Sequence, residues 1–259
     1  MSLLQLKNIK MVFNPGTVNE TPVFDGFNLH LEKGQFLSVI GSNGSGKTTL
    51  LNLIAGNILP LAGSISFEGK DILGLKEYER ARFMGRVFQD PGKGTSPSMT
   101  ILENMALADN KGRSYGLLSG VNRARREYYR NRLEQLRLGL EDKIDTPVNS
   151  LSGGQRQALA LLICTLTPIK LLILDEHTAA LDPKTSETIM ALTNKIVKEQ
   201  GVTALMVTHN LRYAVEYGNR LIMMNKGETV IDAAGAEKKK LAVSDLVHIF
   251  SEISIELGN

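Results

Sequence analysis

The sequence predicts an α/β fold with a mostly parallel central sheet, an N-terminal antiparallel β-subdomain and an inserted α-helical subdomain. Three observations lead to this class. Short apolar runs without polar alternation stand at 36–40, 171–175 and 203–207, which is typical of strands covered on both faces in a parallel sheet. The first sixty-odd residues instead alternate apolar and polar positions, and a segment rich in helix formers lies at about 92–150.

The N-terminal alternation predicts half-buried antiparallel strands. Its apolar members recur at every second position, as Phe27, Leu29 and Leu31 and again as Ile65 and Phe67, which is the period of a strand with one covered face.

Two later features complete the order of the elements. In the helix-rich segment Tyr129, Leu133 and Leu136 repeat at helical spacing. Near the end, Gly227 in MNKGETV suits a tight turn between two strands. We expect residues 1–259 to form one domain whose helical insertion begins near 92 and continues beyond 150 into an apolar helix that ends near 166.

Bulk properties exclude several classes of protein. The 259 residues are 42% hydrophobic, which suffices for a core, and the net charge of +3 is too small to make nucleic acid the main expected partner. No stretch approaches the roughly 18 uninterrupted apolar residues of a membrane span, and the start lacks the pattern of a signal peptide, so a cytosolic chain is expected. Cys164 is the single cysteine; we expect a buried thiol, with no disulfide framework and no cysteine metal site.

The strongest motif follows the first buried strand, where GSNGSGKT at 41–48 fits the phosphate-loop pattern in full. Backbone N–H groups at a helix start hold phosphate, and glycines allow the backbone to curl around it. Lys47 adds a positive charge for the β- and γ-phosphates, and the Thr48 hydroxyl can bind Mg²⁺. The alternative is a glycine-rich turn between strand and helix. The candidate nucleotide ligands here are Gly41, Ser42, Asn43, Gly44, Ser45, Gly46, Lys47, Thr48 and Thr49.

A second motif, LLILDE at 171–176, places two acidic residues at the end of the next buried strand. Asp175 at a strand end can hold Mg²⁺ through its water shell. Glu176, one residue later, is positioned to orient a water and take its proton as a general base. The alternative is an exposed acidic pair with no catalytic role.

The stretch LSGGQ at 151–155 predicts an exposed helix start. Ser152 is a preferred N-cap, and Gly153 and Gly154 offer backbone N–H groups with no side chain in the way of an anion. Since the chain already has a phosphate loop, this second anion site could serve the nucleotide of another copy across a two-fold axis. An ordinary capped helix explains the same residues, and both explanations stay open at this point.

LSGGQ, the phosphate loop and LLILDE together resemble the ATPase subunits of ABC transporters over essentially the whole chain. The resemblance implies a P-loop NTPase fold of the ABC type, with ATP and Mg²⁺ as cofactors. It also implies three partners: a second ATPase subunit, an integral membrane permease and an extracytoplasmic binding protein. The chain would then lie at the cytoplasmic inner face of the cell membrane.

The resemblance assigns further residues. It implies that Ser152, Gly153, Gly154 and Gln155 contact the γ-phosphate held by the partner copy. Gln89 in RVFQDP looks like the glutamine that senses Mg²⁺ and nucleotide. Asp182 in AALDP looks like part of the loop that crosses the dimer interface. His209 looks like the switch histidine at the γ-phosphate. Phe13 looks like the aromatic residue that stacks on adenine. Phe13 could equally be a core residue. The implied catalytic set is Lys47, Gln89, Glu176 and His209, and the implied metal set is Thr48, Gln89 and Asp175.

Two departures from the family pattern stand out. His177 follows the catalytic glutamate where proline is usual, and its role is open. The helical segment is long and carries a basic cluster that is expected to be a solvated helix face, with lipid or permease docking as the lesser alternative; it consists of Arg123, Arg125, Arg126, Arg130 and Arg132.

The motifs are similar to those of bacterial uptake systems linked to tryptophan or other aromatic amino acids, although an ATPase subunit does not touch cargo. Three alternatives are a small-molecule kinase, a non-transport ABC ATPase acting on nucleic acid or ribosomes, and a non-catalytic scaffold. A kinase has no use for LSGGQ, and neither a long coiled coil nor a second cassette is present to favour the non-transport types. Glu176 argues against the scaffold.

Overall fold

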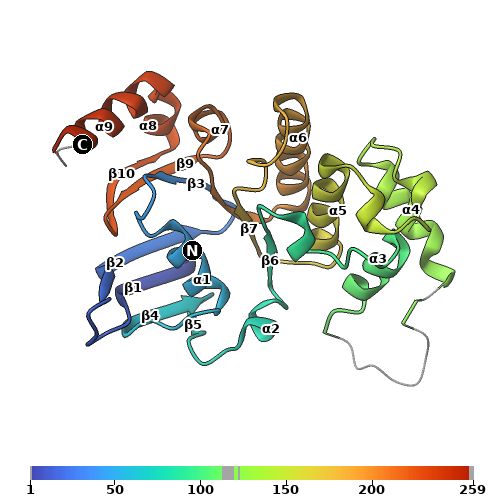
Figure 1. Ribbon diagram of the computed structural model, residues 1–259, viewed down its shortest axis with the longest axis horizontal. Coiled ribbons are helices and arrows are strands. Elements are labelled where there is room, and N and C mark those ends of the chain that lie inside the picture. The colour runs from blue at the N-terminus through green and yellow to red at the C-terminus, as the bar shows by residue number, and fades with distance from the viewer. Residues whose placement is uncertain (1, 113–119, 122, 257–259) are drawn as a thin grey trace. The chain divides into compact units, whose positions relative to one another are not determined.

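The computed structural model describes residues 2–112, 120–121 and 123–256, with the side chains of 123 and 253–256 excepted (Figure 1). The chain divides into two compact units, Met1–Ala81 with Thr203–Asn259, and Arg82–Val202.

The first unit contains the predicted antiparallel sheet. Its strands are β1 (Ser2–Phe13), β2 (Thr21–Glu32), β4 (Ala62–Phe67) and β5 (Lys70–Asp71), in the order β2-β1-β4-β5 with every pairing antiparallel (blue to cyan in Figure 1). Phe27, Leu29 and Leu31 are all buried, and the residues between them are exposed. The period-two prediction is therefore confirmed.

The same unit holds a second set of strands, β3 (Phe36–Gly41), β8 (Thr203–Val207), β9 (Arg220–Asn225) and β10 (Glu228–Ala234), in the order β10-β9-β3-β8. β3 runs parallel to both β8 and β9, and every residue of β3 and β8 is buried, as predicted for strands covered on both faces. β9 and β10 form an antiparallel hairpin. Gly227 turns it, and a Cβ there would lie 1.8 Å from the carbonyl oxygen of Val23, so only glycine fits.

Helices α1 (Lys47–Ala55), α2 (Glu77–Arg80), α7 (Leu211–Glu216), α8 (Gly235–Lys240) and α9 (Val243–Glu256) complete this unit. A buried arginine fixes the C-terminal end of α1. The Arg80 guanidinium donates to the carbonyl oxygens of Leu53 at 2.8 Å and Ile54 at 2.9 Å. These are carbonyls of the last turn, which a helix cannot satisfy internally, so Arg80 holds the helix that follows the phosphate loop.

The second unit contains β6 (Met84–Val87) and β7 (Leu171–Asp175), which pair in parallel with Arg86 opposite Ile173. Among the described residues of this unit, four α-helices accompany the strands: α3 (Ile101–Asp109), α4 (Arg126–Glu134), α5 (Gly153–Thr165) and α6 (Pro183–Gln200). Short 3₁₀ turns lie at Pro91–Lys93, Arg123–Arg125, Glu141–Lys143 and Val148–Ser150.

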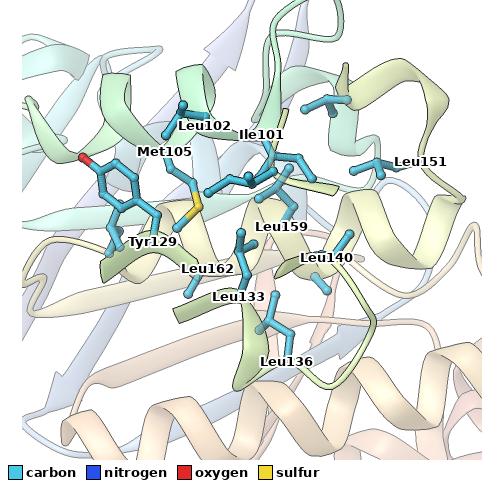
Figure 2. Close-up of a cluster of buried hydrophobic side chains, with 14 of the residues drawn as sticks. Ile101, Leu102, Met105, Tyr129, Leu133, Leu136, Leu140, Leu151, Leu159 and Leu162 are labelled. Atoms are coloured by element: carbon cyan, nitrogen blue, oxygen red, sulfur yellow. The ribbon is translucent and has the colours of Figure 1, made fainter. Parts of the chain in front are cut away.

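One apolar cluster joins α3, α4 and α5, and Figure 2 shows its side chains converging. Tyr129, Leu133 and Leu136, predicted from helical spacing, all lie in it and are buried. The Tyr129 hydroxyl donates to the buried Asp109 carboxylate at 2.9 Å, so the ring stays in the core while its polar end is satisfied.

The basic cluster at the start of α4 and in the turn before it is partly exposed and is paired with acidic side chains. Arg125 forms an ion pair with Asp109 at 2.6 Å, Arg126 pairs with Asp145, and Arg130 lies 3.4 Å from Asp142. These acidic side chains belong to the same unit and neutralise much of the positive charge, so the structure does not favour docking to lipid. The side chain of Arg123, and residues 113–119 and 122 of the long insertion, lie outside the described residues.

Candidate nucleotide-binding site

The phosphate loop occupies 41–46, between β3 and α1. Gly46 is the N-cap of α1 with φ of 100° and supplies no side-chain cap, and a Cβ there would meet the Phe24 ring at 2.8 Å. The first helical bond runs from the N–H of Leu50 to Gly46 at 2.8 Å. The N–H groups of Lys47, Thr48 and Thr49 therefore stand at the positive end of a helix, where an anion binds.

The side chain of Lys47, the first residue of α1, folds back onto this loop. Its Nζ is buried with the rest of the side chain and donates to the carbonyl oxygens of Gly41 and Ser42, both at 2.8 Å. The loop thus holds an ammonium group at its centre, with the Thr48 side chain exposed beside it. This arrangement provides cationic and N–H donors for phosphate oxygens and a hydroxyl for a metal.

The structure brings His209 next to the loop. His209 follows β8, and together with Gly41, Ser42 and Asn43 it lines a cavity of about 280 Å³. Phe250 of α9 lines the same cavity. Sequence reasoning missed Phe250, because no motif marks a C-terminal helix that returns to the phosphate loop.

Phe13 lies at the end of β1, opposite Thr21 of β2. Its side chain is 37% exposed. An accessible ring suits base stacking better than it suits the alternative of a core residue.

Asp175 and Glu176 lie in the other unit, at the end of β7. The Asp175 Oδ2 accepts from Arg86 at 2.6 Å. Glu176 has a φ of 48°, a left-handed conformation rare for a residue with a side chain, and its carbonyl accepts from the N–H of Ala179 at 2.9 Å. A strained residue at a strand end is a pattern of functional sites.

The oxygen donors predicted for a metal fit Mg²⁺. Thr48 offers a hydroxyl, Gln89 an amide oxygen and Asp175 a carboxylate, all hard ligands. Within the part of the chain that is described, no group of three or more His, Cys, Asp or Glu side chains could enclose an ion. A sparse oxygen set suits a metal that keeps several waters and takes phosphate oxygens as further ligands.

His177 points away from solvent, into α6. Its Nε2 lies 3.1 Å from the Oγ1 of Thr193, and this hydroxyl donates to the carbonyl of Ile189 at 2.8 Å. Because the hydroxyl has one hydrogen, His177 must donate from Nε2–H. Burial lowers the pKa of His177 to about 4, so the ring is neutral at pH 7. The open role of His177 is thus resolved as an anchor for the loop that carries Glu176.

The LSGGQ start of α5 shows the capped helix that the sequence predicted, while the anion site stays a prediction. The Ser152 Oγ accepts from the Gln155 N–H, and the Gln155 Oε1 accepts from the Ser152 N–H, both at 3.2 Å. This is a capping box. Since the cap uses only a lone pair, the hydroxyl proton of Ser152 can still be donated to a phosphate oxygen.

The two glycines of LSGGQ differ in their surroundings. A Cβ on Gly154 would lie 2.3 Å from the Cγ2 of Thr185, whereas on Gly153 it would meet only the Leu181 side chain at 3.5 Å. Gly154 is therefore required by packing, and Gly153 is not.

Further predicted residues meet around a second cavity, of about 480 Å³, which Gln89, Gly153 and Leu181 line together with Pro91 and Arg156. Asp182 caps α6 by accepting from the N–H of Thr185 at 3.0 Å, and this hydrogen bonding with Thr185 lowers the pKa of Asp182. Gln89, LSGGQ and the Leu181-Asp182 loop thus belong to one unit. The phosphate loop, His209 and Phe13 belong to the other.

Comparison with known proteins identifies similar chains. Residues 24–179 match the family described as ABC transporter. A tyrosine transport ATP-binding protein of Clostridioides difficile (strain R20291) is 46% identical over 248 residues, which cover 96% of this chain and 98% of that protein. The lipoprotein-releasing system ATP-binding protein LolD 1 of Caulobacter vibrioides is 36% identical, covering 86% and 92%.

Solved structures agree with the fold. A nucleotide-free ATP-binding cassette from an ABC transporter is 26% identical, with a TM-score of 0.77 over 96% of this chain and 99% of that one. The ATP-binding cassette MJ0796, in a dimeric post-hydrolysis state bound to ADP and Pi, is 31% identical, with a TM-score of 0.75 over 89% and 98%. In residues 2–112, 120–121 and 123–256, no helix has the length and apolar character needed to cross a bilayer.

Proposed function

Because the chain belongs to the ABC transporter family and is an ATP-binding subunit that energises such a transporter, we propose that it hydrolyses Mg²⁺-ATP as a pair of copies and powers the import of tyrosine or a related aromatic amino acid. The observation that carries ATP chemistry is the uncapped start of α1 behind the 41–46 loop, with the Lys47 ammonium held at its centre. The cargo class rests on the near full-length similarity to the tyrosine transport ATP-binding protein.

The phosphate loop binds and orients the nucleotide. In this proposal the α1 N–H groups and Lys47 hold the β- and γ-phosphates, and Phe13 stacks on the base. Thr48, Asp175 and Gln89 hold Mg²⁺, which when bound neutralises charge on the phosphate oxygens.

Glu176 orients the attacking water and takes a proton at its carboxylate. His177 supports this by holding the loop to α6 through Thr193, so the carboxylate is placed before the nucleotide arrives. His209 donates to the γ-phosphate from its position beside the loop.

A second copy completes the site. Ser152, with its hydroxyl proton available, and the N–H groups of Gly153 and Gly154 contact the γ-phosphate bound by the partner, while Asp182 crosses the interface. A dimeric solved cassette with the same fold supports this pairing. Hydrolysis then opens the pair, and a separate permease converts the two states into transport.

The remaining partners follow from import. We propose a membrane permease and an extracytoplasmic binding protein, with the ATPase at the cytoplasmic inner face of the membrane and no role for nucleic acid.

Glu176→Gln tests the hydrolytic assignment. The variant is expected to bind Mg²⁺-ATP, form a stable dimer in size-exclusion chromatography and hydrolyse ATP at under about 1% of the wild-type rate, since a general base contributes 10²–10⁴-fold. Glu187→Gln, the same change at an exposed position of α6, is the matched control and should behave as wild type. Normal turnover in Glu176→Gln would remove the general-base role.

Cargo is tested separately. Tagged Glu176→Gln protein with Mg²⁺-ATP should co-purify with a multi-span permease and an extracytoplasmic binding protein from solubilised membranes of its host. The melting temperature of that binding protein should rise with micromolar tyrosine. Recovery of soluble partners alone, such as ribosomes, would contradict the transport proposal while leaving the ATPase chemistry intact.

A further inference from the structure

Arg86 is the feature of the site that no motif anticipates. It lies opposite Ile173 in the parallel pair β6 and β7. Asp175 is two residues beyond Ile173, and alternate residues of a strand share a face, so both side chains project from the same face of the pair. There the Arg86 guanidinium donates to the Asp175 Oδ2 at 2.6 Å.

The surroundings of this ion pair keep it largely dry. The Arg86 and Asp175 side chains are only 13% and 18% exposed. The guanidinium also lies over the ring of Phe88, 4.8 Å from its centroid. A pair shielded in this way is screened far less than a surface pair, and the planar guanidinium is held in place on two sides.

The carboxylate that is proposed to hold Mg²⁺ through water therefore already has a cationic partner. The guanidinium occupies Oδ2 at hydrogen-bond distance, and its charge offsets the charge that attracts a metal. The carboxylate keeps further lone pairs for a metal-bound water, so Arg86 competes with the metal through its charge and its hold on the carboxylate orientation.

We propose that Arg86 is a built-in competitor for the metal-binding carboxylate, and that it sets the Mg²⁺ concentration at which the cassette binds nucleotide. This inference rests on the metal role given to Asp175 under the proposed function. By offsetting the charge of Asp175, Arg86 raises the Mg²⁺ concentration that this carboxylate needs, and this would couple metal binding to nucleotide binding. An Arg86 that acts as a phosphate ligand would have the opposite signature, because its removal would weaken nucleotide binding at every Mg²⁺ concentration.

The test measures binding, apart from turnover. The full chain is titrated with methylanthraniloyl-ATP, a fluorescent ATP analogue, at Mg²⁺ concentrations from chelator-buffered micromolar to 10 mM. Arg86→Gln is expected to lower the Mg²⁺ concentration at half-maximal binding by about tenfold, equivalent to about 1.4 kcal/mol. Without Mg²⁺ it should bind the analogue no better than wild type, because the exposed charge of Asp175 then repels phosphate.

Matched variants separate the possible results. Arg82→Gln removes the same charge at an exposed position of the same segment and should leave the Mg²⁺ midpoint unchanged. Arg86→Lys retains the charge without the planar fork and should fall between wild type and Arg86→Gln. Melting curves confirm that each variant is folded.

Asp175→Asn distinguishes failure of this inference from failure of the proposed function. If the effect of Arg86→Gln disappears in the Asp175→Asn background, the two side chains act through each other, as proposed. An unchanged or raised midpoint in Arg86→Gln, while Asp175→Asn alone shifts it, overturns the competitor role only. An unchanged midpoint in Asp175→Asn itself overturns the metal role of Asp175.

Discussion

Gly154→Ala tests why a helix begins on two adjacent glycines. The new Cβ would lie 2.3 Å from the Cγ2 of Thr185, while the next atoms of that side chain are 3.7 and 3.8 Å away. Overpacking of this kind costs about 1–3 kcal/mol, and the better helix propensity of alanine returns about 0.5–1 kcal/mol. We expect a net loss of about 1–2 kcal/mol in the free energy of unfolding.

The same geometry predicts its own rescue. Thr185→Ser deletes Cγ2 and leaves only atoms at ordinary contact distance, so in that background Gly154→Ala should no longer destabilise and should stabilise by about 0.5 kcal/mol through helix propensity. The assay is urea unfolding of the four proteins of the cycle, followed by circular dichroism. An equal loss in both backgrounds would refute the packing argument.

ATP turnover in the rescued double variant separates packing from ligand contact. Since alanine keeps the backbone N–H, a return of activity together with stability means that the missing Cβ of Gly154 serves only the α5–α6 contact. Activity that stays low in a stable double variant means that a Cβ at this position also obstructs the nucleotide of the proposed two-copy arrangement.

Three other expectations follow from buried groups. Arg80→Met leaves the carbonyls of Leu53 and Ile54 without their charged donor and should lower the free energy of unfolding by about 3 kcal/mol, measured by urea denaturation. Nucleotide affinity should fall in parallel. Unchanged stability would contradict the anchoring role of Arg80. Burial lowers the pKa of His177 to about 4, so as the pH falls the unfolded chain binds a proton before the folded chain does. The free energy of unfolding should therefore fall between pH 6.5 and pH 4, by up to about 3 kcal/mol. His177→Gln should flatten this loss in denaturation series at stepped pH. Burial raises the pKa of the Cys164 thiol to about 11, so iodoacetamide at pH 8 should label the native protein at least about 100-fold more slowly than the urea-unfolded chain.

The parts of the fold that local pattern controls could be predicted from the sequence. Fully apolar runs marked the strands from Phe36 and from Thr203, and period-two alternation marked the N-terminal sheet, because burial on two faces or one face leaves different patterns. The phosphate loop could be predicted equally well, since its function requires glycines and a lysine at set spacing in one continuous segment.

The contacts around Asp175 and Glu176 could not be predicted from the sequence, because they join segments that are distant along the chain. Arg86 meets Asp175 across 89 positions, His177 meets Thr193 across 16, and each depends on strand register or helix rotation that no single segment encodes. The ion pairs of the basic cluster could not be predicted for the same reason. Its partners Asp109, Asp142 and Asp145 lie on other elements.

The LSGGQ start shows how a structural role is compatible with a proposed functional role in one side chain. The cap uses a lone pair of Ser152 Oγ and fixes the oxygen over the first turn of α5. Fixing the oxygen leaves its hydrogen directed away from Gln155, since a hydroxyl that accepts from a backbone N–H keeps its own proton for another acceptor. The cap therefore positions the oxygen and leaves its hydrogen to be donated to the proposed partner phosphate. A capped helix and an anion site are therefore compatible at this position, and the anion site stays a prediction.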